Sequence, residues 1–299
     1  MKISLSVVNF LGILLVASYL ASATESSQYV RIGRQLQDEV DDSIYQNIVG
    51  GEETEEHEFP AYVLFANGEC GGTLIAPDRV LTSANCVYGG HPDTVRVGAS
   101  TRTNGHEVKV KCAKSHPNYL WPHYPHDIAV LKLKEEVTYL APAELNRNTS
   151  YPSEAGTNLT VAGMGRNETK GVMFDRLMKL KYEYVTDLEC KKTYGDAVSQ
   201  GLHICAYKIR VGVCFGDGGS GLYDDEGLLV GALTGAAGGC AATKVYDVYA
   251  DVAAFYDWIQ SQMTDETCDR ECVGCLCDAY LWTSNRASRL FRSIGNLFS

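Results

Sequence analysis

The chain has 299 residues, 45% of them hydrophobic, so it can bury the core of a large domain, and intrinsic disorder is excluded as its main state. Its formal net charge of -11 at pH 7 argues against nucleic acid or an anionic membrane as partner, because both repel an acidic surface. Eleven cysteines are typical of a disulfide framework in an oxidising compartment, and their odd number leaves at least one thiol without an intrachain partner.

The first residues have the pattern of a secretory signal peptide. Lys2 precedes an apolar run from Ile3 to Leu20, and the small residues Ala21-Ser22-Ala23 follow as a cleavage site. A membrane anchor is the weaker interpretation, because the run is barely long enough to cross a bilayer and no basic cluster follows it. We therefore expect a secreted, extracellular protein that loses residues 1–23 and has no stable membrane insertion.

The middle of the chain predicts an all-β domain after a short leader. Residues 24–47 are polar and acidic, without apolar periodicity. Residues 48–263 contain short runs rich in Val, Leu, Ala and Tyr, such as 61–65, 128–133 and 228–233, separated by Gly and Asn. Short strands with frequent turns predict a β-barrel or a β-sandwich.

Three sequons for N-glycosylation lie within this region. They begin at Asn148, Asn158 and Asn167. Single sequons occur by chance, but three so close together favour glycosylated surface loops and agree with export.

The end of the chain predicts a helix and then a tail of different character. The stretch Val252 to Met263 predicts a closing helix with one apolar face, made by Val252, Phe255, Tyr256 and Ile259. Residues 264–299 form a cysteine-rich and amphipathic tail. Its four cysteines are Cys268, Cys272, Cys275 and Cys277. Disulfides are favoured over zinc there, Cys112 is a candidate for a long bridge to the tail, and the pairing stays open; no metal or cofactor is expected.

A series of motifs follows one another between residues 48 and 263. In chain order they are Ile48-Val49-Gly50-Gly51, Cys70-Gly71-Gly72-Thr73-Leu74-Ile75, Val80-Leu81-Thr82-Ser83-Ala84-Asn85-Cys86, His126-Asp127-Ile128-Ala129-Val130-Leu131, His203-Ile204-Cys205-Ala206 and Cys214-Phe215-Gly216-Asp217-Gly218-Gly219-Ser220-Gly221-Leu222. Their order and spacing resemble the chymotrypsin/trypsin family. The resemblance implies two six-stranded antiparallel β-barrels with the active-site cleft between them. It also implies three disulfides, Cys70–Cys86, Cys190–Cys205 and Cys214–Cys240.

The same resemblance places the family's catalytic triad on Asn85, Asp127 and Gly218. The mechanism needs an imidazole as the base and a serine hydroxyl as the nucleophile, with a carboxylate that orients the imidazole. The Asn85 amide has no usable proton affinity and Gly218 has no nucleophile, so only Asp127 survives. Neither Ser220, which is two residues beyond Gly218, nor His126, which should face away from Asp127, is expected to replace them. The chain is therefore predicted not to be an enzyme.

The substrate pocket implied by the resemblance has changed as well. Gly212 falls on the pocket floor, so no buried acid is expected to receive Arg or Lys. The segment that pairs with a substrate backbone reads Thr234-Gly235-Ala236 and lacks its aromatic wall. The backbone N–H groups of Gly216 and Gly218 can still form a nest for an anion, but a nest alone does not hydrolyse an ester or amide.

The activation signal of the family is altered too. Precursors in the family are cut after Arg or Lys directly before Ile-Val-Gly-Gly, and Asn47 stands at that position here. If Ile48 becomes a free amino terminus, the resemblance implies that it pairs with Asp217. Removal of the leader stays open.

An exported, inert protease homologue is most similar to the glucanase inhibitor proteins of plant-pathogenic oomycetes. The resemblance implies an apoplastic effector that binds a host plant endo-β-1,3-glucanase, protects the pathogen's wall glucans and suppresses glucan-elicited defence. Two alternatives stay open. One is an inactive homologue that serves as a regulatory cofactor or adhesin, and the other is a hydrolase with residual activity.

Overall fold

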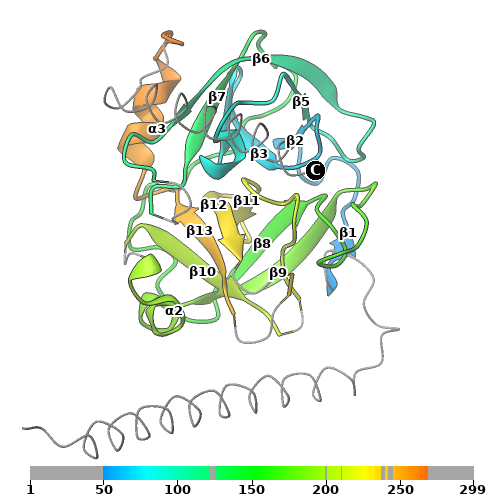
Figure 1. Ribbon diagram of the computed structural model, residues 1–299. Coiled ribbons are helices and arrows are strands. Elements are labelled where there is room, and N and C mark those ends of the chain that lie inside the picture. The colour runs from blue at the N-terminus through cyan, green and yellow to red at the C-terminus, as the bar shows by residue number, and fades with distance from the viewer. Residues whose placement is uncertain are drawn as a thin grey trace, which may run out of the picture. The chain divides into compact units, whose positions relative to one another are not determined.

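The computed structural model describes the domain that the motifs predict. The described residues are 50–120, 125–198, 201–209, 211–236, 240–241 and 245–268. The predicted signal peptide, the leader, Ile48-Val49 and the tail beyond Cys268 lie outside the described residues. Within the described ranges the strands form two barrels (Figure 1).

The first barrel is closed by antiparallel strands in the order β2-β3-β4-β7-β6-β5. These strands are β2 (Tyr62–Phe65), β3 (Gly71–Ala76), β4 (Arg79–Thr82), β5 (Thr94–Val97), β6 (His106–Ser115) and β7 (Ala129–Leu133). Every second residue of a barrel strand faces inward. The alternating valines of β5 and β6 therefore fill this barrel, and they are Val95, Val97, Val108 and Val110.

The second barrel has the order β9-β10-β13-β12-β11-β8, with β8 also pairing with β9, and β1 adds to the β9 edge. Its strands are β1 (Glu52–Glu53), β8 (Asn158–Gly163), β9 (Met178–Val185), β10 (His203–Tyr207), β11 (Gly221–Tyr223), β12 (Leu229–Ala236) and β13 (Asp247–Asp251). Its core includes Leu159, Leu180, Ile204 and Tyr249. The predicted double six-stranded barrel is confirmed.

Four short helical segments complete the described domain. They are η3 (Asn85–Val87), α2 (Asp187–Tyr194), η4 (Gly195–Ala197) and α3 (Tyr256–Met263). None of the helices in the part of the chain that the structure describes is long and apolar enough to span a membrane.

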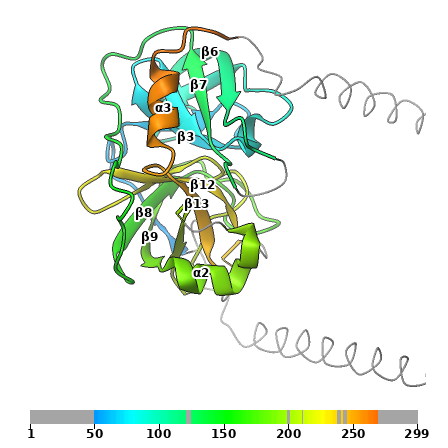
Figure 2. The same cartoon turned by 90° about the vertical axis from the view of Figure 1, so that its left-hand side faces the viewer.

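The predicted closing helix exists as α3, but its predicted start at Val252 is wrong. The Asp251 carboxylate accepts the N–H of Ala253 at 2.9 Å, which holds residues before Tyr256 in a turn. Three members of the predicted apolar face are buried, whereas Tyr256 is only partly buried. The helix lies over strands of the first barrel (Figure 2).

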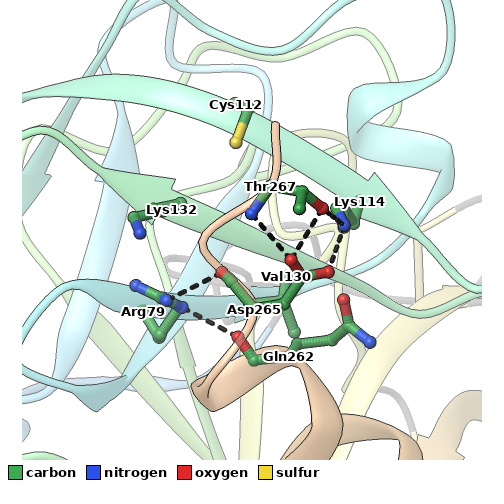
Figure 3. A pocket seen from close by; sticks show the side chains of 8 residues that line it. All are labelled: Arg79, Cys112, Lys114, Val130, Lys132, Gln262, Asp265 and Thr267. Atoms are coloured by element: carbon green, nitrogen blue, oxygen red, sulfur yellow. Dashed lines mark hydrogen bonds and ion pairs between the residues drawn. The ribbon is translucent and has the colours of Figure 1, made fainter. Parts of the chain in front are cut away.

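Beyond α3 the chain runs back over the first barrel, where charged side chains hold it (Figure 3). Arg79 of β4 is 1% exposed and donates to the carbonyl oxygens of Gln262, at 2.9 Å, and Asp265, at 3.1 Å. Because the Gln262 carbonyl belongs to the last turn of α3, the guanidinium caps the helix end. Lys114 of β6 binds the Asp265 carboxylate and the Thr267 hydroxyl.

Four disulfides brace the domain. Three are the pairs that the resemblance implied, Cys70–Cys86, Cys190–Cys205 and Cys214–Cys240. The fourth joins Cys112 to Cys268, with a sequence separation of 156 residues. It is the long bridge for which Cys112 was a candidate, and it fixes the start of the tail on β6. The remaining cysteines, Cys272, Cys275 and Cys277, lie outside the described residues.

Candidate functional site

The three positions that the resemblance assigned to a triad come together where the barrels meet. Asn85 starts η3 shortly after the end of β4 at Thr82, and its backbone N–H donates to the Asp127 carboxylate at 2.7 Å. Gly218 approaches from the second barrel, and its carbonyl accepts the N–H of Gly71 in the first barrel at 2.8 Å. A Cβ atom on Gly218 would lie 3.2 Å from the sulfur of Cys86, the neighbour of Asn85.

Asp127 is a buried carboxyl group whose partners are backbone groups. Asp127 is 3% exposed, and this burial raises the pKa of its carboxyl group to about 7. Hydrogen bonds from the backbone of Asn85 and Ala84 lower that pKa but do not offset the effect of burial. The Asn85 side chain is exposed and, among the described residues, makes no hydrogen bond to Asp127. The Asp127 carboxyl group therefore stabilises the backbone at Ala84 and Asn85, where η3 begins.

The His126 ring packs against aromatic side chains and not against Asp127. The ring stacks on His116 with centroids 4.8 Å apart and meets the edge of Phe255 at 5.8 Å. His126 and Asp127 do not alternate along a strand as expected, because β7 begins only at Ala129. A left-handed backbone conformation, with φ of 62°, directs the His126 side chain instead.

Asp217 is the second buried carboxyl group of the site. It has 0% exposure, and its two oxygens accept the N–H groups of Gly165 at 2.7 Å and Cys214 at 2.9 Å. Burial raises its pKa to about 6, and these two hydrogen bonds and the charge of Arg102 limit the rise. Asp217 thereby pins the loop that carries Gly218.

Ser220, the nearest serine to Gly218 along the chain, is fully buried. A Cβ atom on Gly71 would lie 2.6 Å from its Oγ, so this hydroxyl fills the space that Gly71 leaves between the barrels. The hydroxyl has no hydrogen-bond partner among the described residues. Because it is closed off from solvent, a substrate cannot reach it.

The predicted pocket positions lie on adjacent segments of the second barrel. Thr234 is buried and donates its hydroxyl to the Val248 carbonyl at 2.9 Å, while Gly235 pairs with Val248 and Ala236 with Asp247 across β12 and β13. At Gly212, a Cβ atom would lie 2.7 Å from the Cα of Ala241. Backbone therefore closes the space next to Gly212, and no side chain fits there.

No acid stands at Gly212 itself, but the buried carboxyl group of Asp247 lies beside the segment of Gly212. Its carboxylate accepts the N–H of Val213 at 3.1 Å and the hydroxyl of Tyr182. Burial raises the pKa of Asp247 to about 7 despite these hydrogen bonds. Asp247 comes from β13, far along the chain from Gly212, and no local pattern marks it. Its oxygens are engaged within the domain.

Exposed apolar side chains flank the site, and the sequence reasoning missed them. Phe215 is 58% exposed directly before Gly216, Tyr88 is 54% exposed after η3, and Val172 is 73% exposed. Val172 belongs to a turn whose next residue, Met173, would contact a Cβ atom on Gly216. We call Tyr88, Val172 and Phe215 the apolar rim. Large apolar residues in turns, where polar residues are usual, were the signal available.

The three sequon asparagines lie on the second barrel side of the domain. Asn148 and Asn158 are exposed and line one hollow together with Tyr151, residues 224–226 and Leu228. Asn167 is partly buried, and its side-chain oxygen is enclosed close to Gly171.

Comparison with known proteins identifies the family. Residues 48–259 match the trypsin family. The chain is 31% identical over 226 residues to a trypsin of Saccharopolyspora erythraea, covering 72% of this chain and 98% of that protein. It is 32% identical to the serine protease SP24D of Anopheles gambiae, covering 72% and 81% respectively.

Solved structures agree on the fold. Neuropsin, a serine protease from mouse brain, aligns with a TM-score of 0.65 at 23% identity, over 71% of this chain and 98% of its own. With the double barrel, the disulfides and the match over residues 48–259, the chain belongs to the trypsin family.

Proposed function

We propose that this protein is a secreted, catalytically inactive member of the trypsin family that acts by binding another protein. The observation that carries the proposal is the chemistry at Asn85 and Gly218, which both adjoin the Cys70–Cys86 disulfide. An exposed amide and a residue without a side chain stand where the family's mechanism requires a base and a nucleophile.

The neighbouring groups give further support. The Ser220 hydroxyl is buried, and the His126 ring stacks on His116. Neither can transfer a proton to or from a reacting group at Gly218, because general acid–base catalysis requires hydrogen-bond reach. Loss of such a unit in another serine protease costs about a million-fold in turnover.

We further propose that the partner is a host plant endo-β-1,3-glucanase in the apoplast, bound by the apolar rim. The partner class rests on the resemblance to glucanase inhibitor proteins. The location rests on Tyr88, Val172 and Phe215, because exposed aromatic and aliphatic side chains beside a rigid loop are typical of binding surfaces. The four disulfides hold the described domain that presents them.

A fluorophosphonate probe tests inactivity. We expect no labelling of the purified protein under conditions that label an active trypsin completely. Labelling at a residue of this site would contradict the proposal and favour the alternative of a hydrolase with residual activity.

A pull-down from plant apoplastic fluid, followed by a glucan-hydrolysis assay, tests the partner. We expect an endo-β-1,3-glucanase in the bound fraction and a loss of its activity. Phe215→Ser should weaken binding by about tenfold or more, as loss of a central apolar anchor does. Leu188→Ser is the matched control, because Leu188 is 70% exposed on α2, outside the apolar rim.

The outcomes separate the proposals. Absence of glucanase from the bound fraction, with undiminished glucan hydrolysis, would exclude this partner and favour a regulatory cofactor or adhesin. Equal loss of binding for Phe215→Ser and Leu188→Ser would show that the apolar rim is not the contact surface.

A further inference from the structure

The loop that presents Phe215 and Gly218 depends on one buried anion. Asp217 ties residues 214–220 together, because it accepts the Cys214 N–H through its side chain and the Ser220 N–H, at 3.0 Å, through its backbone carbonyl. A fully buried carboxylate is costly unless hydrogen bonds and a counter-charge compensate it. The sequence resemblance assigned that charge to a free amino terminus at Ile48, which exists only after cleavage between Asn47 and Ile48.

Arg102 of the first barrel supplies a cation from within the domain. It lies between β5 and β6, and its guanidinium crosses to the second barrel, where Nε donates to the Phe174 carbonyl at 2.7 Å and Nη2 donates to the Met164 carbonyl. Its backbone N–H also donates to the Asp175 carbonyl at 3.0 Å. Three contacts thus hold this arginine against one segment of the second barrel.

A single peptide group joins the cation to the anion. The Met164 carbonyl accepts from Arg102, and the N–H of the same peptide group, which belongs to Gly165, donates to Asp217 at 2.7 Å. The peptide dipole therefore has its negative end at the guanidinium and its positive end at the carboxylate. Hydrogen bonds to charged groups are about twice as strong as neutral ones, and bonds in a chain polarise one another.

Two glycines make room for this arrangement. A Cβ atom on Gly68 would lie 2.5 Å from Nη1 of Arg102. Gly68 also has a φ of 72°, which residues other than glycine rarely adopt. A Cβ atom on Gly165 would overlap the Asp217 carboxylate. A side chain at either glycine would therefore displace the Arg102 guanidinium or the Asp217 carboxylate.

We propose that Arg102, acting through the Met164–Gly165 peptide, is the internal counter-charge that keeps the Asp217 loop formed while the chain is uncut before Ile48. The binding surface that includes Phe215 is then complete without proteolytic activation. This inference deepens the proposed function, on whose binding surface it rests. Arg102 is a positioning residue, since it acts through Asp217.

Hydrogen exchange of the full secreted chain with its leader tests the role of Arg102. We expect Arg102→Gln to speed exchange of the amides of residues 214–220 by tenfold or more, with a smaller change for Arg102→Lys, which keeps the charge. Arg96→Gln is the matched control, because Arg96 pairs with Glu107 on the first barrel. Unchanged exchange at residues 214–220 in Arg102→Gln would overturn the proposal.

A second experiment tests whether Arg102 is the counter-charge of Asp217 even if Arg102→Gln does not fold. Residues 43–47 are replaced by an enteropeptidase site, so that cleavage frees Ile48, and Tm is measured before and after cleavage. We expect no change for the chain that keeps Arg102 and a rise for Arg102→Lys. A rise of several degrees with Arg102 present would show that the amino terminus is the missing counter-charge. Both experiments use no partner, so their failure is distinct from failure of the proposed function.

Discussion

The first barrel contributes one buried carboxyl group, Asp127, and the second contributes another, Asp217, but only Asp217 has a cation among the groups that shift its pKa. Asp127 receives backbone hydrogen bonds from Asn85 and Ala84, and burial raises its pKa to about 7. Asp217 receives two backbone N–H groups and the field of Arg102, and its pKa rises only to about 6. Backbone N–H groups thus hold both carboxyl groups, and the charge of Arg102 further lowers the pKa of Asp217.

The largest expected effect comes from removing the anchor. Asp217→Ala leaves two buried N–H groups and the Arg102 charge without their partner, so we expect a loss of about 3–5 kcal/mol in the free energy of unfolding. Urea denaturation measures it. Asp196→Ala, at a fully exposed acid, should change stability by less than about 0.5 kcal/mol. Equal effects of the two substitutions would refute the role of Asp217 as anchor.

The pH dependence of stability isolates Asp127. Its folded pKa of about 7 lies above the value in the unfolded chain, so the folded state binds the proton more tightly. The resulting stabilisation is fully present at acid pH, below the unfolded pKa, and is lost as pH rises through about 7. Between pH 5 and pH 8 the protein should lose about 2 kcal/mol more than Asp127→Asn does.

Titrations that oppose that of Asp127 are common to the parent and to Asp127→Asn, so they cancel when the two pH profiles are subtracted. Burial lowers the pKa of His116 to about 4 and that of His126 as well, so these rings favour the folded state as pH rises, in both proteins. Parallel pH profiles for the parent and Asp127→Asn, from urea unfolding, would show that Asp127 is ionised at all these pH values.

A smaller effect is expected at the pocket position. Gly212→Ala should cost about 1–3 kcal/mol, because its Cβ meets the backbone of Ala241 at 2.7 Å. Gly218→Ala is the control, since its Cβ meets the sulfur of Cys86 at 3.2 Å and a small shift suffices. Thermal unfolding compares the two. A tolerated Gly212→Ala would show that the space beside Gly212 is open.

The smallest change is expected from introducing the histidine and serine of the family's triad at Asn85 and Gly218. Asn85→His combined with Gly218→Ser should yield no efficient cleavage of chromogenic Arg or Lys substrates. The carboxylate that could receive such a side chain, Asp247, is held by Tyr182 and Val213. Efficient Arg-specific hydrolysis by the double variant would show that the pocket is functional.

Local signals account for what could be predicted of the fold. Short apolar runs separated by turn residues predicted a β-barrel or a β-sandwich, and the resemblance of the motifs to the chymotrypsin/trypsin family implied the two six-stranded barrels. The boundary of α3 could not be predicted, because the Asp251 side chain competes for the N–H of Ala253. The sequence left the partner of Cys112 open, because the pairing with Cys268 depends on the tertiary contact between β6 and the chain after α3.

The sequence by itself determined which chemical groups are available at the site, since an amide at Asn85 and a bare backbone at Gly218 have the same chemistry in any fold. Only the tertiary structure decided that Ser220 is closed off from solvent, that Asp247 lies beside the segment of Gly212, and that Arg102 reaches the Met164–Gly165 peptide group, which binds Asp217. Each of these depends on contacts between residues far apart in the chain. Such contacts follow from the packing of the two barrels, which local periodicity does not encode.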